Sequence, residues 1–396
     1  MTVVKIAHIT TIDLSLRYLL FNQLRSIQAA GYAVTGISTP GPDVPVLTTA
    51  GIPHISVPMT RTLSPLADLK ALAQLVRVLR RERFTVVHTH NPKPGLLGQL
   101  AARLAGVPFV VNTLHGFYFH AGTKSTVRRF YITLEKLAAR CSDVILSQNS
   151  EDIQTAIAEG ICPPEKIKFL GNGIDLQRFD RRRIDPQALA QRCAEFNLDP
   201  TRPVVGFVGR LVAEKGILEL LQAAKQVLAV APTTQFLVVG PIDHEKADAL
   251  TPAIAQEYGV ADAFTFTGLR QDMPELYALM DLFVLPSHRE GFPRSPMEAS
   301  AMRVPCIVTD IRGCREAVEH ERNGLLVPLG QADALAAAIL QLLAQPEQAK
   351  ALGQAGRQLA EAHFDEELVF SKVKAEYRRL LTTKLGLAPG DQSQIA

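Results

Sequence analysis

The chain of 396 residues contains no tryptophan and no run of about 18 apolar residues free of charge, so we expect no membrane-spanning helix. Its five cysteines are odd in number and never show C-x-x-C spacing, which argues against a disulfide framework or a zinc ribbon and favours the cytoplasm. The first residues, MTVVKIAHITTID, carry Lys5 and Asp13 around a short β-rich stretch, which is not typical of a signal peptide.

Two short motifs are missing as well. No two aspartates have D-x-D spacing, so we expect no divalent metal clamp of that kind on a diphosphate. The end of the first predicted strand and the segment after it read HITTIDLSLR, without any glycine. A nicotinamide-binding domain needs a glycine-rich turn at this place, so we predict no such cofactor.

The residues that are present describe a folded protein, with 47% apolar and 20% charged residues and a length typical of two or three domains. Residues 1–200 carry 23 Lys and Arg against 15 Asp and Glu, whereas residues 201–396 carry 19 against 24. The first half therefore favours anionic neighbours. Because no zinc finger, helix-turn-helix or aromatic-rich sheet motif accompanies this charge, we expect an anionic membrane surface or lipid-linked substrate rather than nucleic acid.

Short β-branched runs alternate with amphipathic segments along the chain. Continuous apolar strands separated by helices predict parallel sheets buried on both faces, hence an α/β fold with two Rossmann-like doubly wound domains facing across a cleft. In such sheets ligands bind at the carboxyl ends of the strands. The predicted strands are 3–9, 33–38, 86–90, 109–112, 144–147, 167–170, 204–208, 235–239, 264–266, 282–285, 306–309 and 324–327.

The join between the two predicted domains is polar, basic and irregular. We therefore predict an N-terminal domain over 1–175, a linker over 176–200 and a C-terminal domain over 201–363. We expect a helix over 364–387 that is able to pack back on the first domain, and a flexible tail over 388–396.

The first motif with chemical meaning is VVGFVGRLVAEKG, residues 204–216. It places Arg210 and Lys215 between the end of a strand and the start of a helix. Free amides and the helix dipole add to the two cations there, which predicts an anion site. The alternative, an exposed pair with Glu214, stays open.

The second motif is SHREGFPRSPMEASAMRVP, residues 287–305. Glu290 falls in a loop, where its carboxylate can accept hydrogen bonds from sugar hydroxyls, and Glu298 falls on the first helical turn, where it can hold two ribose hydroxyls. The amides around 292–295 would point at a phosphate. A competing interpretation remains for Glu298, because Ser295-x-x-Glu298 also matches a capping box.

GRLVAEKG, followed some 75 residues later by EGFPRSPMEASA, and the segment RNGLLVP (322–328) resemble the retaining GT-B nucleotide-sugar glycosyltransferases of family 4 over essentially the whole chain. The segments HTHNPKPGLLGQLAARLAGVP (88–108) and NTLHGFYF (112–119) are similar to the branch that builds capsule, exopolysaccharide or O-antigen repeat units on a lipid carrier. The resemblance makes the first domain the acceptor side and the second the nucleotide-sugar side. Many members carry paired glycines after the first strand, where this chain has Ser15 and Leu16.

The resemblance also implies a role for each motif. Arg210 and Lys215 would neutralise the donor diphosphate, Glu298 would bind the ribose, and Glu290 would contact the transferred sugar. His115 would face that sugar from the first domain. The further donor-binding residues that it implies are Gly268, Leu269, Arg270, Gly291, Phe292, Pro293 and Arg294, with Ser15 and Leu16 in the N-terminal loop.

Three histidines near strand ends allow two interpretations each. His115 precedes Gly116, which permits close backbone approach and favours a site role, although neighbouring backbone could instead satisfy its ring. His88 and His90 are spaced i, i+2 and face one side of a strand, an arrangement that metal ligands also show. No third ligand lies nearby in sequence, so we favour a structural or acceptor-side role and predict no metal.

Together these features predict a retaining, metal-independent hexosyltransferase of surface polysaccharide biosynthesis that needs no cofactor. The donor would be a nucleoside-diphosphate sugar, UDP-linked by resemblance, carrying a hexosyl or N-acetylhexosaminyl group, and the acceptor would be lipid-linked or a saccharide. We expect a cytoplasmic protein, and leave open peripheral binding to the inner face of the membrane. A non-hydrolysing nucleotide-sugar epimerase and a catalytically silent scaffold of a polysaccharide assembly complex remain the alternatives. Basic residues at helical spacing, interpretable as solvated helix faces or as a docking surface, are Arg77, Arg80, Arg81, Arg83, Lys124, Arg128, Arg129, Lys136 and Arg140.

Overall fold

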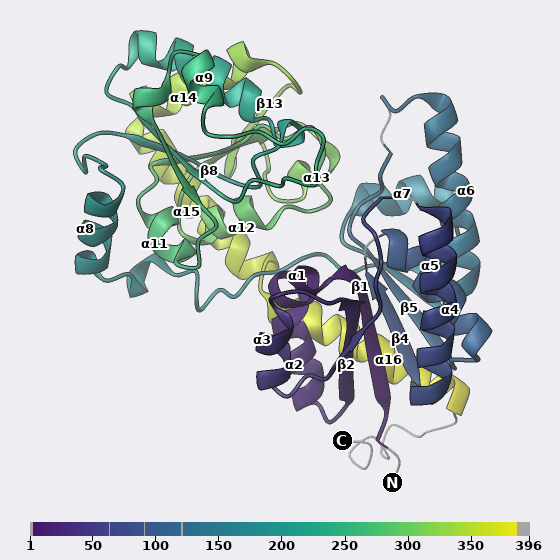
Figure 1. Ribbon diagram of the computed structural model, residues 1–396. Coiled ribbons are helices and arrows are strands. Elements are labelled where there is room, and N and C mark those ends of the chain that lie inside the picture. Colours follow the sequence, from purple (N-terminus) through teal and green to yellow (C-terminus); the bar gives the residue numbers. More distant parts are fainter. Residues whose placement is uncertain (1–2, 63, 91, 120–121, 386–396) are drawn as a thin grey trace. The chain divides into compact units, whose positions relative to one another are not determined.

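The computed structural model describes residues 3–62, 64–90, 92–119 and 122–385. They form two compact units, one built from the described residues up to Gly171 together with those from Val369 onward, and one from Asn172–Leu368 (Figure 1). Each unit contains a parallel sheet flanked by helices, which confirms the predicted α/β class. Among the described helices, none combines the length and the apolar character that crossing a membrane requires.

The first unit has a seven-stranded parallel sheet in the order β3-β2-β1-β4-β5-β6-β7. The order reverses between β1 and β4, which are neighbours in the sheet although β2 and β3 lie between them in sequence. The strands are β1 (Lys5–Ile12), β2 (Ala33–Thr39), β3 (His54–Ser56), β4 (Val86–His90), β5 (Phe109–Leu114), β6 (Val144–Ser147) and β7 (Ile167–Phe169).

Helices cover both faces of this sheet. The helical segments are α1 (Asp13–Ser15), the π-helical turn η1 (Leu16–Leu20), α2 (Phe21–Ala29), α3 (Val44–Thr49), α4 (Pro65–Glu82), α5 (Pro92–Ala105), α6 (Ser125–Cys141), α7 (Ser150–Ala158), the 3-10 turn η2 (Pro164–Lys166) and the C-terminal α16 (Glu366–Leu385). Ile6 and Val86 point to the face covered by α2 and α16, whereas Ala7 and Val87 point to the face covered by α4 and α5. Both faces are apolar because both are covered.

The second unit has a six-stranded parallel sheet in the order β10-β9-β8-β11-β12-β13. Its order reverses between β8 and β11, which pair directly. The strands are β8 (Val204–Val208), β9 (Gln235–Val239), β10 (Phe264–Gly268), β11 (Leu282–Leu285), β12 (Cys306–Thr309) and β13 (Gly324–Val327). The helices are η3 (Arg181–Arg183), α8 (Pro186–Glu195), η4 (Ala213–Lys215), α9 (Ile217–Val230), α10 (Ile254–Glu257), η5 (Ala261–Ala263), α11 (Met273–Ala278), α12 (Arg294–Ala301), α13 (Arg312–Arg315), α14 (Ala332–Ala344) and α15 (Pro346–His363).

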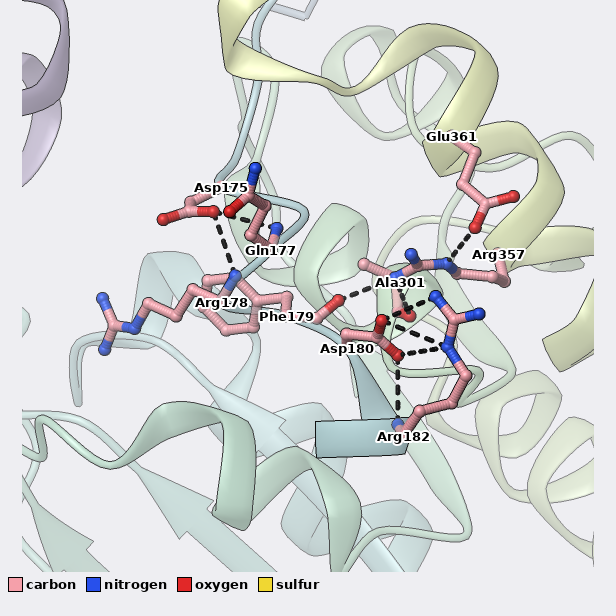
Figure 2. Close-up of polar contacts among 9 residues, drawn as sticks. All are labelled: Asp175, Gln177, Arg178, Phe179, Asp180, Arg182, Ala301, Arg357 and Glu361. Atoms are coloured by element: carbon pink, nitrogen blue, oxygen red, sulfur yellow. Dashed lines mark hydrogen bonds and ion pairs between the residues drawn. The ribbon is translucent and has the colours of Figure 1, made fainter. Parts of the chain in front are cut away.

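The segment 176–200, which we predicted as a linker, is built into the second unit and contains η3 and α8. Figure 2 shows what holds it: buried Arg357 of α15 donates to the carbonyl of Phe179 at 2.8 Å and to that of Ala301 at 3.0 Å. Asp180 receives hydrogen bonds from the backbone and guanidinium of Arg182. The polar composition that suggests a linker therefore serves contacts within one unit, whose first residue is Asn172.

The C-terminal helix α16 contributes to the core of the first unit. Helix α15 ends at His363 and α16 begins at Glu366, two residues after the start that we predicted for the helix over 364–387. The last two residues of that predicted helix and the tail 388–396 lie outside the described residues. Its buried face joins the same apolar cluster as Ile6, Leu24 and Phe109. The residues of that face are Val369, Phe370, Val373, Tyr377, Leu380 and Leu381.

Candidate active site

The loops that follow β8 and β11 meet in the second unit, because these two strands are neighbours at the point where the strand order reverses. Gly216 closes the β8 loop with φ +79°, and a Cβ there would lie 2.0 Å from the carbonyl oxygen of Pro286 in the β11 loop. Only glycine permits this approach. The two sequence motifs, some 75 residues apart, are thus brought into contact by the sheet.

Lys215 and Glu290 form an ion pair at this meeting point, with Nζ 2.5 Å from Oε1. The hydroxyl of Ser287 donates to the same carboxylate oxygen at 2.7 Å. The side chains of Lys215 and Glu290 are only 18% and 9% exposed, so the pair is held in one arrangement. Lys215 does not pair with its neighbour Glu214, which binds Arg289 at 2.7 Å. An ammonium has three donors, so Lys215 can hold Glu290 and still donate to an anion.

Arg210 lies on the same loop but has a different partner. Its Nη1 is 2.5 Å from Oδ2 of Asp243, which follows β9 and is nearly buried. The arginine side chain itself is 37% exposed. The interpretation of Arg210 as part of an exposed pair with Glu214 is therefore wrong, since its partner comes from another strand end.

Glu298 is a partly buried carboxylate on the first turns of α12. Its Oε2 accepts a hydrogen bond of 2.9 Å from the hydroxyl of Tyr277, a fully buried residue of α11. Burial raises the pKa of Glu298, an effect that Arg294 partly opposes. Helix α12 begins at Arg294 with Pro293 at its N-cap position, so Ser295 does not cap the helix and the capping-box interpretation is not realised.

The start of α12 presents backbone donors next to these carboxylates. Pro293, at the N-cap position, offers no side-chain acceptor to the amides of the first turn. The preceding Phe292 is buried, its ring packs edge-on against Phe364 at 5.8 Å, and its carbonyl accepts a hydrogen bond from Asn172 at 2.9 Å. A rigidly held helix start, with the positive end of the helix dipole, suits an anion.

The loop 268–271 follows β10. Gly268 adopts φ +71°, and its carbonyl accepts from Gly240 N at 2.9 Å. Leu269 is exposed, whereas Arg270 is engaged by Asp272 at 2.6 Å and by Glu195. Gln271 is exposed as well, and its backbone carbonyl accepts a hydrogen bond from Arg178 at 2.6 Å.

In the first unit, β1 runs almost directly into helical turns. Ser15 ends α1, and Leu16 is completely buried in the apolar core beneath α2. Asp13 is buried and accepts a hydrogen bond from Asp43 N at 2.8 Å. The side chain of Leu16 serves the core, so at this position the loop can offer a ligand its backbone but no side chain. Ser15 is 8% exposed and Leu14 46%.

His115 follows β5 and belongs to a cluster of four histidines together with His8 of β1 and His88 and His90 of β4. Its Nδ1 lies 3.0 Å from Oε1 of Gln148 and its Nε2 lies 3.2 Å from Nδ1 of His90. Nε2 of His90 lies 3.0 Å from Nδ1 of His8. Burial lowers the pKa of His115 to about 4 and that of His8 to about 3. These rings are therefore neutral at physiological pH.

The structure thus joins Lys215 with Glu290 and places Glu298 on the adjacent helix, while His115 belongs to the first unit. Sequence reasoning missed Ser287, Asp243 and Tyr277, which are polar partners supplied by strand ends or by a separate helix. It also missed His8, although the signal was present: β1 and β4 are neighbours in any sheet of this order, and His8 stands opposite His88.

Comparisons with known proteins agree with this architecture. Residues 192–359 match the family model described as "Glycosyl transferases group 1", and residues 20–173 match the "Glycosyl transferase 4-like domain". The chain is 34% identical over 286 residues, 72% of its length, to the UDP-Gal:alpha-D-GlcNAc-diphosphoundecaprenol alpha-1,3-galactosyltransferase of Escherichia coli, of which the match covers 73%.

Two further matches span nearly the whole chain. The capsular polysaccharide biosynthesis glycosyltransferase CapM of Staphylococcus aureus is 27% identical over 395 residues, with 96% of this chain and 99% of that protein covered. Anabaena HepE in complex with UDP-glucose superposes with a TM-score of 0.80 at 21% identity, covering 95% of this chain and 99% of that one, a likeness of fold.

Proposed function

The chain belongs to the group 1 glycosyl transferases and serves the synthesis of polysaccharide or lipid-linked sugar, and from this premise we propose a specific reaction. It transfers a hexosyl or N-acetylhexosaminyl group from a UDP-linked donor to a lipid-linked or saccharide acceptor, with retention at the anomeric carbon and without a metal. The E. coli relative carries UDP-Gal and a diphosphoundecaprenol acceptor in its name, and HepE binds UDP-glucose, which supports this choice of donor and acceptor.

The observation that carries the proposal is the contact between Lys215 and Glu290 at the reversal point of the second sheet. Lys215 is anchored by the carboxylate at 2.5 Å and keeps two N–H donors for the diphosphate. Arg210 and the amides at the start of α12 add positive potential. As the bond from the sugar to the diphosphate breaks, negative charge grows on the leaving phosphate, and fixed donors of this kind are worth about 3 kcal/mol each.

The carboxylates order the two ends of the donor in this proposal. Glu290 accepts from hydroxyls of the transferred sugar while Ser287 and Lys215 hold its other lone pairs. Glu298, fixed by Tyr277, binds the ribose hydroxyls. Backbone of 268–271 borders the base, and backbone of Gly291, Phe292, Pro293 and Arg294 lies along sugar and phosphate.

The chemical step needs no enzymic nucleophile. The acceptor hydroxyl attacks the anomeric carbon from the side that the diphosphate leaves, a new carbon–oxygen bond replaces the broken one, and the hydroxyl proton passes to a phosphate oxygen of the leaving group. We place His115 opposite the transferred sugar and Ser15 beside the diphosphate, both from the first unit. Closure of the site would exclude water and suppress hydrolysis of the donor.

We place the acceptor lipid near helix α6. Through this helix the protein would bind peripherally to an anionic inner membrane face. Three large apolar side chains of α6 are exposed, Val127 at 43%, Phe130 at 47% and Leu137 at 46%. Lys124, at the N-cap of α6, and Arg129 are exposed as well. Apolar anchors bordered by cations suit anionic headgroups.

Calorimetry tests the donor site. We expect UDP and UDP-sugars to bind wild-type protein, and Lys215→Ala to weaken UDP at least about tenfold, consistent with the loss of a charge-assisted contact. Lys225→Ala, which removes an exposed lysine of α9, is the matched control. Transfer to a diphosphoundecaprenol-linked sugar, unchanged by EDTA, is the expected activity. Equal UDP binding by the two variants would overturn the phosphate role, and a sugar converted without acceptor would identify an epimerase.

A further inference from the structure

A continuous chain of hydrogen bonds crosses the interior of the first unit from the loop after β6 to helix α16. It starts at Oε1 of Gln148 and passes through His115 and His90 to His8, with contacts of 3.0, 3.2 and 3.0 Å. From Nε2 of His8 it continues to the hydroxyl of Tyr377 at 3.3 Å. His8 and His90 are 0% and 1% exposed, so water does not share these contacts.

A second arm leaves the same hydroxyl. The hydroxyl of Tyr377 lies 2.5 Å from Nδ1 of His88, and Nε2 of His88 lies 2.7 Å from Oγ1 of Thr113. His88 and Tyr377 are both fully buried. Seven residues from four strand or loop segments and one helix thus form one chain of six contacts.

The donor and acceptor roles of the side chains allow one direction for this chain of hydrogen bonds. The carbonyl oxygen of Gln148 only accepts, so His115 donates through Nδ1–H. A neutral imidazole has one N–H and one lone pair, so Nε2 of His115 accepts from Nδ1–H of His90, whose Nε2 in turn accepts from Nδ1–H of His8. Nε2 of His8 is then left as an acceptor, and the hydroxyl of Tyr377 lies 3.3 Å from it.

The tyrosine hydroxyl completes the sequence of donors. The hydroxyl of Tyr377 donates its hydrogen bond to His8, so its oxygen is free to accept one from Nδ1–H of His88. Nε2 of His88 accepts from the hydroxyl of Thr113. Every ring nitrogen then has a partner of the correct kind with all four imidazoles neutral, which agrees with the effect of burial on their pKa values.

A metal site is the competing interpretation, since one nitrogen from each of His8, His88 and His90 lies within 4.8 Å of the others. A metal would need lone pairs that the hydrogen-bond chain already uses. The hydrogen-bond chain accounts for all the nitrogens, whereas the metal accounts for three.

We propose that Tyr377 is a positioning residue for His115. The carbonyl of Gln148 at one end of the chain sets the Nδ1–H tautomer of His115, and Tyr377 at the other end, acting through His8 and His90, holds the orientation of its ring. Tyr377 thereby ties the site loop of the first unit to helix α16. The importance of this for turnover rests on the proposed function, in which His115 faces the sugar. The tautomer pattern itself does not depend on it.

Long-range ¹H–¹⁵N spectra of the full-length protein test the proposal, because they distinguish the two neutral tautomers and the protonated ring. Among the ten histidines, at least four are expected to be neutral Nδ1–H at pH 7.5. The His115 signal is identified by its loss in His115→Gln. In Tyr377→Phe we expect His115 to remain Nδ1–H but its ring signals to shift, although His8 and His90 separate the two side chains. Tyr32→Phe is the control, since that ring packs edge-on against Tyr377 at 6.2 Å.

His115 ring signals at the same positions in Tyr377→Phe as in wild type would overturn the proposal. So would one equivalent of Zn²⁺ bound by wild-type protein with loss of the Nδ1–H signals. If Tyr377→Phe fails to fold, the wild-type spectrum still decides, because fewer than four Nδ1–H histidines contradict the chain. In the transfer assay we expect Tyr377→Phe to lower kcat about tenfold with little change in KM. Failure of the proposed function would appear instead as no transfer by wild type, with the spectra unaffected.

Discussion

The hydroxyl of Tyr277 donates to Oε2 of Glu298 at 2.9 Å, although the two residues are 21 positions apart and lie on different helices. The tyrosine is completely buried, and burial raises its pKa well above the usual value, so it stays a donor. The contact fixes the position of Oε2 and thereby also sets where Oε1 of the same carboxylate points. A residue of the core therefore sets the geometry of a proposed ribose ligand.

Tyr277→Phe removes that donor while keeping the packed ring. A hydrogen bond to a charged group contributes about 1.5–3 kcal/mol, so we expect UDP affinity to fall about tenfold or more. Tyr258→Phe makes the same chemical change at a half-buried position of the same unit. Calorimetry that finds equal UDP affinity in both variants would show that Glu298 does not depend on Tyr277 for binding.

Glu290→Gln keeps the shape of the side chain and an acceptor for Ser287, but removes the charge 2.5 Å from Lys215. We expect turnover to fall on the order of 100-fold, as for other losses of a positioned charge at a reacting centre. The melting temperature should change little, because the loop supports little of the core. Glu214→Gln, whose carboxylate binds Arg289 instead, is the control, and equal turnover of the two variants would remove Glu290 from the site.

The neutral histidines predict a loss of stability in acid. Burial lowers the pKa of His115 to about 4 and that of His8 to about 3, below the value of about 6.5 in an unfolded chain. The unfolded state therefore binds more protons below pH 6.5, so the stabilisation is complete above that pH and is lost as the pH falls. Each such histidine contributes up to about 1.4 kcal/mol per pH unit.

Hydrogen exchange of β1 and β4, corrected for the intrinsic pH effect, measures this loss between pH 7 and pH 5. His115→Gln should lose less protection than wild type because it takes up one proton fewer. His363→Gln, at an exposed position in the second unit, should behave as wild type. A loss as large in His115→Gln as in wild type would contradict the assignment of His115 as a neutral ring.

Helix α6 predicts binding to anionic vesicles. Each cation near the headgroups is worth about 1 kcal/mol, and the exposed ring of Phe130 adds apolar burial. We expect sedimentation with phosphatidylglycerol vesicles but not with phosphatidylcholine, and several-fold weaker binding by Phe130→Ser. Leu329→Ser changes an equally exposed apolar residue of the second unit and should bind as wild type. No dependence on lipid charge would refute the membrane proposal.

Arg357→Met tests how the segment before α8 is held. The change leaves the buried carbonyls of Phe179 and Ala301 without their donor, which costs about 2–4 kcal/mol. The melting temperature of the second unit should fall by several degrees. Arg322→Met, at an exposed arginine paired with Glu319, should change it by less than a degree or two, and the same drop in both would show that the contacts in Figure 2 contribute nothing.

Much of the fold was predictable because buried parallel strands are continuous apolar runs. The bounds of β4, β6 and β11 agree with those expected from the sequence. The short edge strand β3 (His54–Ser56) was missed, since two half-buried residues and one exposed residue form no such run. The segment 176–200 was predicted as a linker although it belongs to the second unit. Its polar composition is the same whether these residues face solvent or form hydrogen bonds with neighbouring elements.

The sequence predicted that Lys215 and Glu290 stand in loops at the strand ends of one parallel sheet, because right-handed parallel connections leave few ways to arrange these strands. Their approach to 2.5 Å was decided by the observed strand order. The partners that orient the polar groups do not follow from the sequence. Tyr277, Asp243 and Tyr377 reach their partners across 21, 33 and 289 positions, and a hydrogen bond depends on the final positions of two side chains rather than on spacing. Sequence determined which chemical groups stand at the strand ends; tertiary packing decided what holds each of them in place.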